Sequence, residues 1–164
     1  MFPRFALNMS AFEVQNGEVT IVGETKGTGP RVVCITGWAN SRDVWSGLSE
    51  NLCKDHQVTT WDLRGHGESG APPPGNYDRK EALKDISAVL DEVGRPCVLV
   101  GHSLGGYLSL AYALEKPLSE NTSVVFVPRL DVPLTVIFIP ARMALTILVS
   151  SSGPWFHAVS PSVN

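Results

Sequence analysis

Short apolar runs alternate along the chain with segments whose apolar residues recur at helical spacing. Three runs rich in β-branched residues, at residues 31–36, 56–62 and 97–100, predict buried strands. A clear helical pattern covers residues 78–93, and a weaker one covers residues 45–53. Strands that alternate with helices predict right-handed crossovers and a parallel sheet with helices on both faces.

Capping and turn residues mark the boundaries of these elements. Asp78 and Glu81 have the spacing of a capping box at the start of the clear helix, and Gly94 is expected to end it. Nearer the N-terminus, the Asn16-Gly17 turn signal separates two short alternating runs. An antiparallel hairpin is therefore expected before the parallel part.

The segment 101–106, Gly-His-Ser-Leu-Gly-Gly, directly follows the third apolar run and opens a helical pattern over residues 104–114. Gly101 and Gly105, two positions either side of Ser103, allow a tight turn that lifts the serine hydroxyl clear of the sheet. The helix that follows directs its free N–H groups and positive dipole end at whatever reacts there. The pattern favours a nucleophilic serine; the alternative is a plain strand-to-helix turn in which Ser103 is a cap.

Three motifs follow the predicted strands in order. They read Thr36-Gly37-Trp38, Asp62-Leu63-Arg64-Gly65-His66-Gly67-Glu68-Ser69 and Gly101-His102-Ser103-Leu104-Gly105-Gly106. Together they resemble the α/β-hydrolase family, over about residues 11–114 and again over 144–156, where residues 145–151 resemble the sixth strand. The resemblance implies an α/β fold with a mostly parallel sheet, an N-terminal antiparallel hairpin and helices on both faces, incomplete at its C-terminal side.

The same resemblance implies acyl transfer through Ser103. In the family, a serine at this position is found in esterases, lactonases and carbon–carbon bond hydrolases, whereas epoxide hydrolases and haloalkane dehalogenases carry aspartate. The implied substrates are small esters, lactones or related acyl compounds, with no cofactor. By resemblance, the backbone N–H groups of Trp38 and Leu104 would form the oxyanion hole.

A general base and an orienting acid would complete such a site, and in the family both follow the nucleophile. By chain order the candidates are Asp131 and His157. The family normally inserts a cap region and two further strands before its histidine, so the other interpretation is that this chain lacks the acid and the base. His102, inside the turn, and His66, in a glycine-rich segment, are weaker candidates. No Cys/His spacing typical of a metal site is present.

The chain of 164 residues is expected to hold one partial α/β-hydrolase domain, residues 11–164, after an extension at residues 1–10. Residues 118–139 separate the helix after the turn from the resembling sixth strand, and we interpret them as an insertion of splicing or gene-model origin. The alternative is an ordinary loop or an extra edge strand. A sheet that ends after its sixth strand would expose an edge through which chains could self-associate.

Composition narrows the function classes. A net charge of −3 without a basic cluster argues against nucleic-acid binding. Pro140 and Arg142 interrupt the apolar residues 133–150, which favours buried strands over a membrane span. Cys34 and Cys97 fall in predicted strands, as expected for reduced thiols in a cytoplasmic protein. Two functions remain open: a serine hydrolase of small acyl substrates, and a catalytically inactive isoform or interaction module with the same fold.

Overall fold

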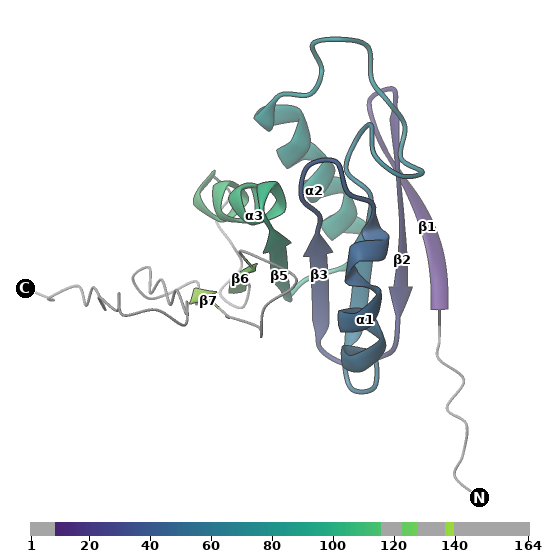
Figure 1. Ribbon diagram of the computed structural model, residues 1–164, viewed down its shortest axis with the longest axis vertical. Coiled ribbons are helices and arrows are strands. Elements are labelled where there is room, and N and C mark those ends of the chain that lie inside the picture. Colours follow the sequence, from purple (N-terminus) through teal and green to yellow (C-terminus); the bar gives the residue numbers. More distant parts are fainter. Residues whose placement is uncertain (1–8, 116–122, 128–136, 140–164) are drawn as a thin grey trace, which may run out of the picture.

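A mixed sheet of seven strands organises the part of the chain that the computed structural model describes, residues 9–115, 123–127 and 137–139. The strand order is β1-β2-β4-β3-β5-β6-β7, and helices cover both faces of the sheet (Figure 1). This arrangement confirms the predicted fold class.

The first two strands form the predicted antiparallel hairpin. β1 (Met9–Asn16) and β2 (Val19–Lys26) pair along their whole length, with Asn16 opposite Val19. Gly17 occupies the turn with a φ of 62°, a conformation that glycine adopts without steric cost. β2 then pairs antiparallel with β4 and so attaches the hairpin to the parallel strands.

Three parallel strands form the centre of the sheet and confirm the three predicted apolar runs. β3 (Arg31–Ile35) lies between β4 (Gln57–Trp61) and β5 (Cys97–His102) and is parallel to both. Along β3 the buried side chains alternate between the two faces of the sheet. Val33 and Ile35 belong to one hydrophobic cluster, and Val32 and Cys34 to the other. Burial on both faces explains why β3 and β5 are nearly continuous apolar runs, whereas β4 also buries Thr59 and Thr60.

The helices lie where the periodicity predicts them. A short 3₁₀ helix, η1 (Arg42–Trp45), leads into α1 (Ser46–Leu52), and α2 spans Arg79–Val93. The Asp78 side chain accepts the Glu81 N–H at 2.9 Å, which confirms the predicted cap, and Gly94 ends α2 with a φ of 86°.

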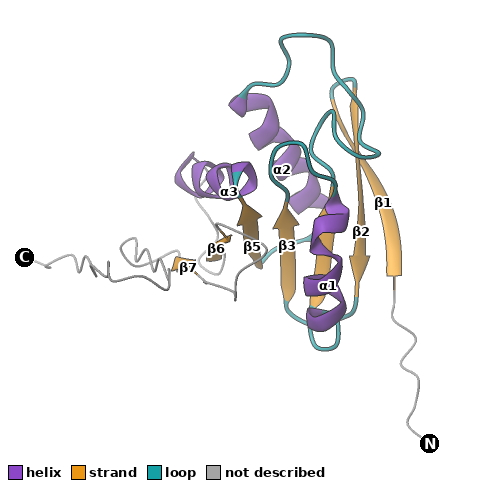
Figure 2. Ribbon diagram, in the orientation of Figure 1, coloured by secondary structure: helices purple, strands orange, loops and turns teal. Residues whose placement is uncertain are grey.

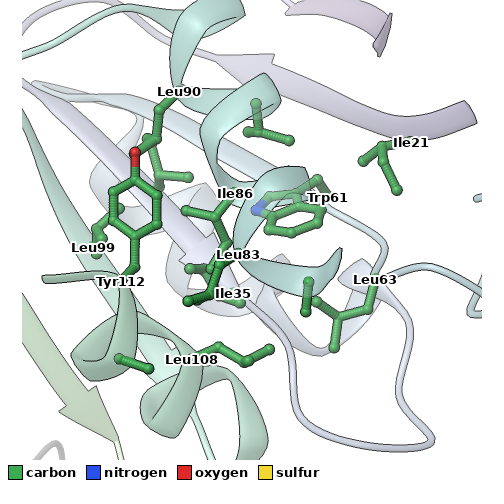
Figure 3. Packing of buried hydrophobic residues seen from close by; sticks show 14 of the residues in the cluster. Ile21, Ile35, Trp61, Leu63, Leu83, Ile86, Leu90, Leu99, Leu108 and Tyr112 are labelled. Carbon is green, nitrogen blue, oxygen red and sulfur yellow. The ribbon is translucent and has the colours of Figure 1, made fainter. Parts of the chain in front are cut away.

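The larger hydrophobic cluster holds α2 and α3 (Leu104–Glu115) against one face of the sheet (Figure 3). Ile86 and Leu90 of α2 and Leu108 and Tyr112 of α3 pack there with Leu99 of β5. The smaller cluster lies under α1 on the opposite face. Because α3 is packed on the sheet, its N-terminus is fixed at the carboxyl end of β5.

Two further strands lie beyond β5 in the described sheet. β6 (Ser123–Val127) pairs parallel with β5, and β7 (Ile137–Ile139) pairs antiparallel with β6. With β3 on its other side, β5 has both of its edges paired. Residues 145–151, which resemble the sixth strand of the family, lie outside the described part, so their place in the sheet stays a prediction. The β-branched and aromatic run at 124–127 has the composition of a strand and follows α3 as a parallel crossover requires.

That residues 118–139 are an insertion stays a prediction, although this segment contains both β6 and β7. Among the helices that the structure describes, none combines the length and the hydropathy needed to span a bilayer.

Candidate active site

A tight turn joins β5 to α3 (Figure 2), and Ser103 is the residue between these two elements. Its φ is 52°, in the left-handed region that residues with a Cβ rarely adopt. Its carbonyl accepts the N–H groups of Gly106 at 3.0 Å and Tyr107 at 3.2 Å, which closes the first turn of α3. The serine is exposed. The turn therefore presents a strained, accessible serine at the start of a helix.

The turn is pressed against β3 so closely that side chains are excluded. A Cβ on Gly101 would lie 2.4 Å from the carbonyl oxygen of Gly105. A Cβ on Gly105 would lie 2.0 Å from the carbonyl oxygen of Ile35 and 2.5 Å from that of Thr36. These contacts are all with backbone atoms, so no side-chain movement could relieve them. Glycine at position 101 allows the turn to close on the start of α3, and glycine at position 105 allows α3 to approach the end of β3.

The loop after β3 lies alongside Ser103. A Cβ on Gly37 would be 3.1 Å from the Cβ of Ser103. The next residue, Trp38, has 64% of its surface exposed. No backbone carbonyl in the described part of the chain accepts the N–H of Trp38 or of Leu104. Their convergence on one oxygen position near Ser103 stays a prediction.

His66 contacts this loop, which sequence reasoning missed. Its Nε2 accepts the N–H of Ala39 at 3.1 Å, and its Nδ1 lies 2.9 Å from the carbonyl oxygen of Arg64. Its ring meets the Trp38 ring edge-on, with the centroids 5.2 Å apart. The sequence did offer a signal, since the loops after neighbouring parallel strands β3 and β4 emerge at the same edge of the sheet.

A second set of contacts joins the same two loops. The Asp62 carboxylate, which is fully buried, accepts the backbone N–H of Arg42 at 2.6 Å and that of Glu68 at 3.1 Å. The Arg42 guanidinium pairs with both carboxylates, Asp62 and Glu68. Buried carboxylates are stable only with such partners, so this cluster fixes the spacing of the two loops.

The loop that carries Asp62 and His66 is itself anchored to α2. Arg64 Nε and Nη2 donate to the two oxygens of the buried Asp85 carboxylate at 2.6 and 2.8 Å. Asn16, at the end of β1, adds a third bond to Asp85 at 2.7 Å. The hydrogen bonds to Asp85 raise the pKa of Arg64 further above its ordinary value. A charged, bidentate pair thus holds the loop on the scaffold.

None of the three histidines in the described ranges hydrogen-bonds to the Ser103 hydroxyl. Both ring nitrogens of His66 are used by backbone groups. His56 pairs with Asp55 at 2.7 Å before β4, at the opposite end of the parallel strands. The Nδ1 of His102 is buried without a partner in the described part, and burial lowers the pKa of this imidazole. Asp131 and His157 lie outside the described residues.

The described residues contain no cluster of three or more His, Cys, Asp or Glu side chains that could hold a metal.

Comparison with known proteins decides the family. Residues 30–125 match the model of the alpha/beta hydrolase fold, and they include both loops and the Ser103 turn. The chain belongs to the alpha/beta hydrolase family. A pimeloyl-(acyl-carrier protein) methyl ester esterase of Nitrosospira multiformis is 30% identical over 123 residues, covering 70% of this chain and 47% of that relative. The chain therefore spans about half the length of this relative.

Other relatives in the family carry different activities. The mouse sn-1-specific diacylglycerol lipase ABHD11 is 33% identical over 54% of this chain and 29% of its own length. Among solved structures, the thioesterase domain from the curacin biosynthetic pathway has a TM-score of 0.62 and 30% identity, over 67% of this chain and 41% of that one. A Vigna radiata epoxide hydrolase has a TM-score of 0.66 at 22% identity, over 76% of this chain and 39% of that one, and shows the shared fold alone.

Proposed function

We propose that this chain is a serine hydrolase that acts on small ester, lactone or related acyl substrates through Ser103. The observation that carries the proposal is the exposed serine with a φ of 52° at the start of α3. Backbone strain of this kind costs on the order of 1–3 kcal/mol, and it persists mainly where function requires a side chain to be held in one position.

The arrangement supports a two-step acyl transfer. The Ser103 oxygen attacks the acyl carbon while a base removes the hydroxyl proton, and the carbonyl electrons move to the oxygen. The N–H groups of Trp38 and Leu104 would stabilise that oxyanion. The electrons then return to re-form the carbonyl, the bond to the leaving group breaks, and the leaving group takes the proton from the base. Water next attacks the acyl-enzyme with the same base, which releases the acid and returns the proton to Ser103. Asp131 and His157 are the acid and base that chain order offers.

The serine supports acyl chemistry over epoxide opening, because the family's epoxide hydrolases carry aspartate at this position. The names of the relatives agree: an esterase, a lipase and a thioesterase all transfer acyl groups from oxygen or sulfur. The substrate of this chain is left open within that class.

A second candidate function is an inactive module with the same fold. It is favoured by the finding that His56, His66 and His102 all lack a bond to Ser103 within the described part of the chain. General-base catalysis typically contributes about 10²- to 10⁴-fold, so a chain without a base would hydrolyse esters weakly at most. Self-association through a sheet edge also stays a prediction for this module.

Labelling with a fluorophosphonate probe, together with hydrolysis of p-nitrophenyl acetate, separates the two functions. The chain should be labelled and should turn over the ester, and both signals should vanish in Ser103→Ala. The matched histidine variants are His157→Ala, which removes the candidate base, and His56→Ala, a control at the far end of the sheet. If His157→Ala loses activity and His56→Ala keeps it, His157 is assigned as the base. A folded chain that is neither labelled nor active would refute the hydrolase and support the inactive module.

A further inference from the structure

Two residues with a Cβ adopt positive φ in the described part of the chain, and both lie next to a proposed oxyanion donor. Ser103, with a φ of 52°, directly precedes Leu104. Ala39, with a φ of 59°, directly follows Trp38. Left-handed backbone is unfavourable for alanine, so its neighbours must hold the Trp38–Ala39 turn in place.

His66 stabilises this turn through two hydrogen bonds of its ring. A carbonyl oxygen only accepts hydrogen bonds, so the contact from Nδ1 to the Arg64 carbonyl requires a proton on Nδ1. In the neutral ring Nε2 then carries a lone pair, and this lone pair accepts the Ala39 N–H at 3.1 Å. One side chain thereby connects the backbone of the loop after β4 to the strained residue of the loop after β3.

The other end of the same loop is fixed as well. Asp62 accepts the Arg42 N–H at 2.6 Å, three residues beyond Ala39. Residues 38–42 are therefore held at both ends by side chains of the loop after β4, and that loop is anchored to α2 through Arg64 and Asp85. Within this segment, both polar groups of the peptide that joins Trp38 to Ala39 are bonded: Asn40 Nδ2 donates to the Trp38 carbonyl at 3.1 Å, and His66 accepts the Ala39 N–H.

We propose that His66 is a positioning residue: by accepting the Ala39 N–H it fixes the backbone next to Trp38, whose N–H is the predicted oxyanion donor beside Ser103. The consequence for catalysis rests on the proposed function of Ser103, whereas the hydrogen bond itself does not. Preset donors matter because an oxyanion hole stabilises charge only when it needs no rearrangement during the reaction.

Packing against Trp38 is the competing role for His66, since the two rings meet edge-on. Two substitutions separate the roles. His66→Phe keeps an aromatic ring beside Trp38 and removes the acceptor. His66→Gln removes the ring and places an amide oxygen that can accept the Ala39 N–H. His56→Ala is the control, because His56 lies at the opposite end of the parallel strands.

The first measurement is nuclear magnetic resonance of the full chain labelled with ¹⁵N. A scalar coupling across the hydrogen bond should join the Ala39 amide to Nε2 of His66, and the ring should carry its proton on Nδ1. Absence of that coupling, or a proton on Nε2, would overturn the proposal without any variant. In His66→Phe, hydrogen exchange of the Ala39 amide should accelerate by about threefold to tenfold, the usual effect of one lost hydrogen bond, and His66→Gln should restore most of the protection.

The second measurement is the rate at which a fluorophosphonate labels Ser103. His66→Phe should slow labelling by about threefold to tenfold, His66→Gln should recover most of the rate, and His56→Ala should match the unmodified chain. Equal rates in His66→Phe and the unmodified chain would overturn the proposal. If the unmodified chain is not labelled, the proposed function of Ser103 fails, and Ala39 exchange in the two His66 variants still decides whether His66 holds the loop.

Discussion

Gly105→Ala tests whether the closeness of the Ser103 turn to β3 is required. The added Cβ would lie 2.0 Å from the Ile35 carbonyl oxygen, a full ångström inside the 3.0 Å below which Cβ contacts are essentially never found. It would also lie 2.5 Å from the Thr36 carbonyl oxygen. β3 is hydrogen-bonded on both edges, so it cannot withdraw, and α3 must move instead.

Two opposing effects determine the size of the change in stability. Alanine is favoured over glycine inside a helix by about 1 kcal/mol. Overpacking of a tight site costs about 1–3 kcal/mol, and contacts between rigid backbone atoms place this site at the upper end. We therefore expect the free energy of unfolding to fall by about 2 kcal/mol. Labelling of Ser103 should also slow, because the first turn of α3 is displaced from the loop after β3.

Urea unfolding followed by tryptophan fluorescence measures the change, since Trp45 and Trp61 are fully buried. With a slope of about 1–2 kcal/mol per molar urea, the midpoint should fall by about 1–2 M. Gly47→Ala is the matched control, because Gly47 lies in α1 and its Cβ would meet no atom within 4 Å. That variant should gain about 0.5–1 kcal/mol. If Gly105→Ala were as stable as the unmodified chain, the close approach would not be a constraint.

The remaining predictions concern buried charge and titration. Asp85→Ala leaves the buried Arg64 charge without its partner and should lower the free energy of unfolding in urea by about 3–5 kcal/mol. Asp91→Ala removes one partner of an exposed pair and should lower it by under about 1 kcal/mol. Equal losses in the two variants would contradict the buried pair. Burial raises the pKa of the Cys34 thiol to about 12, so iodoacetamide near neutral pH should modify this cysteine only after unfolding. Peptide mass mapping measures the modification. A modified Cys34 in the native chain would contradict its burial. Burial lowers the pKa of His102 below its ordinary 6.5, so between the two pKa values the unfolded chain binds a proton that the folded chain does not. The free energy of unfolding is therefore unaffected by this group above pH 6.5 and falls as the pH is lowered below it. His102→Gln should lose less stability than the unmodified chain between about pH 7.5 and 5.5. An equal loss would contradict the burial of His102.

Local pattern in the chain was enough to predict the hairpin, the three parallel strands and the α2 helix with its Asp78 cap. Each of these elements depends on residues close together in sequence, through hydrophobic period, a turn signal or a capping spacing. The turn at Ser103 is local in the same sense, because Gly101 and Gly105 lie only two positions either side of the serine. Beyond α3 the pattern left the strand pairing open: residues 118–139 were interpreted as an insertion, a loop or an extra edge strand, and the structure pairs residues 123–127 with β5. Apolar runs follow α3 in the sequence at residues 124–127 and 145–150. Packing across the sheet determines which strands pair, and neither run by itself contains that information.

Folding in three dimensions decided what surrounds the serine. The sequence placed His66 in a glycine-rich turn some thirty residues from Ala39, and no local rule joins the two. They meet because β3 and β4 are adjacent and parallel, so the loops after them share one edge of the sheet. The same reason applies to Asp62 with Arg42, and to the backbone contact between Gly105 and Ile35. Residue types and their spacing thus predict which groups can react, whereas strand order determines which backbone groups lie beside them.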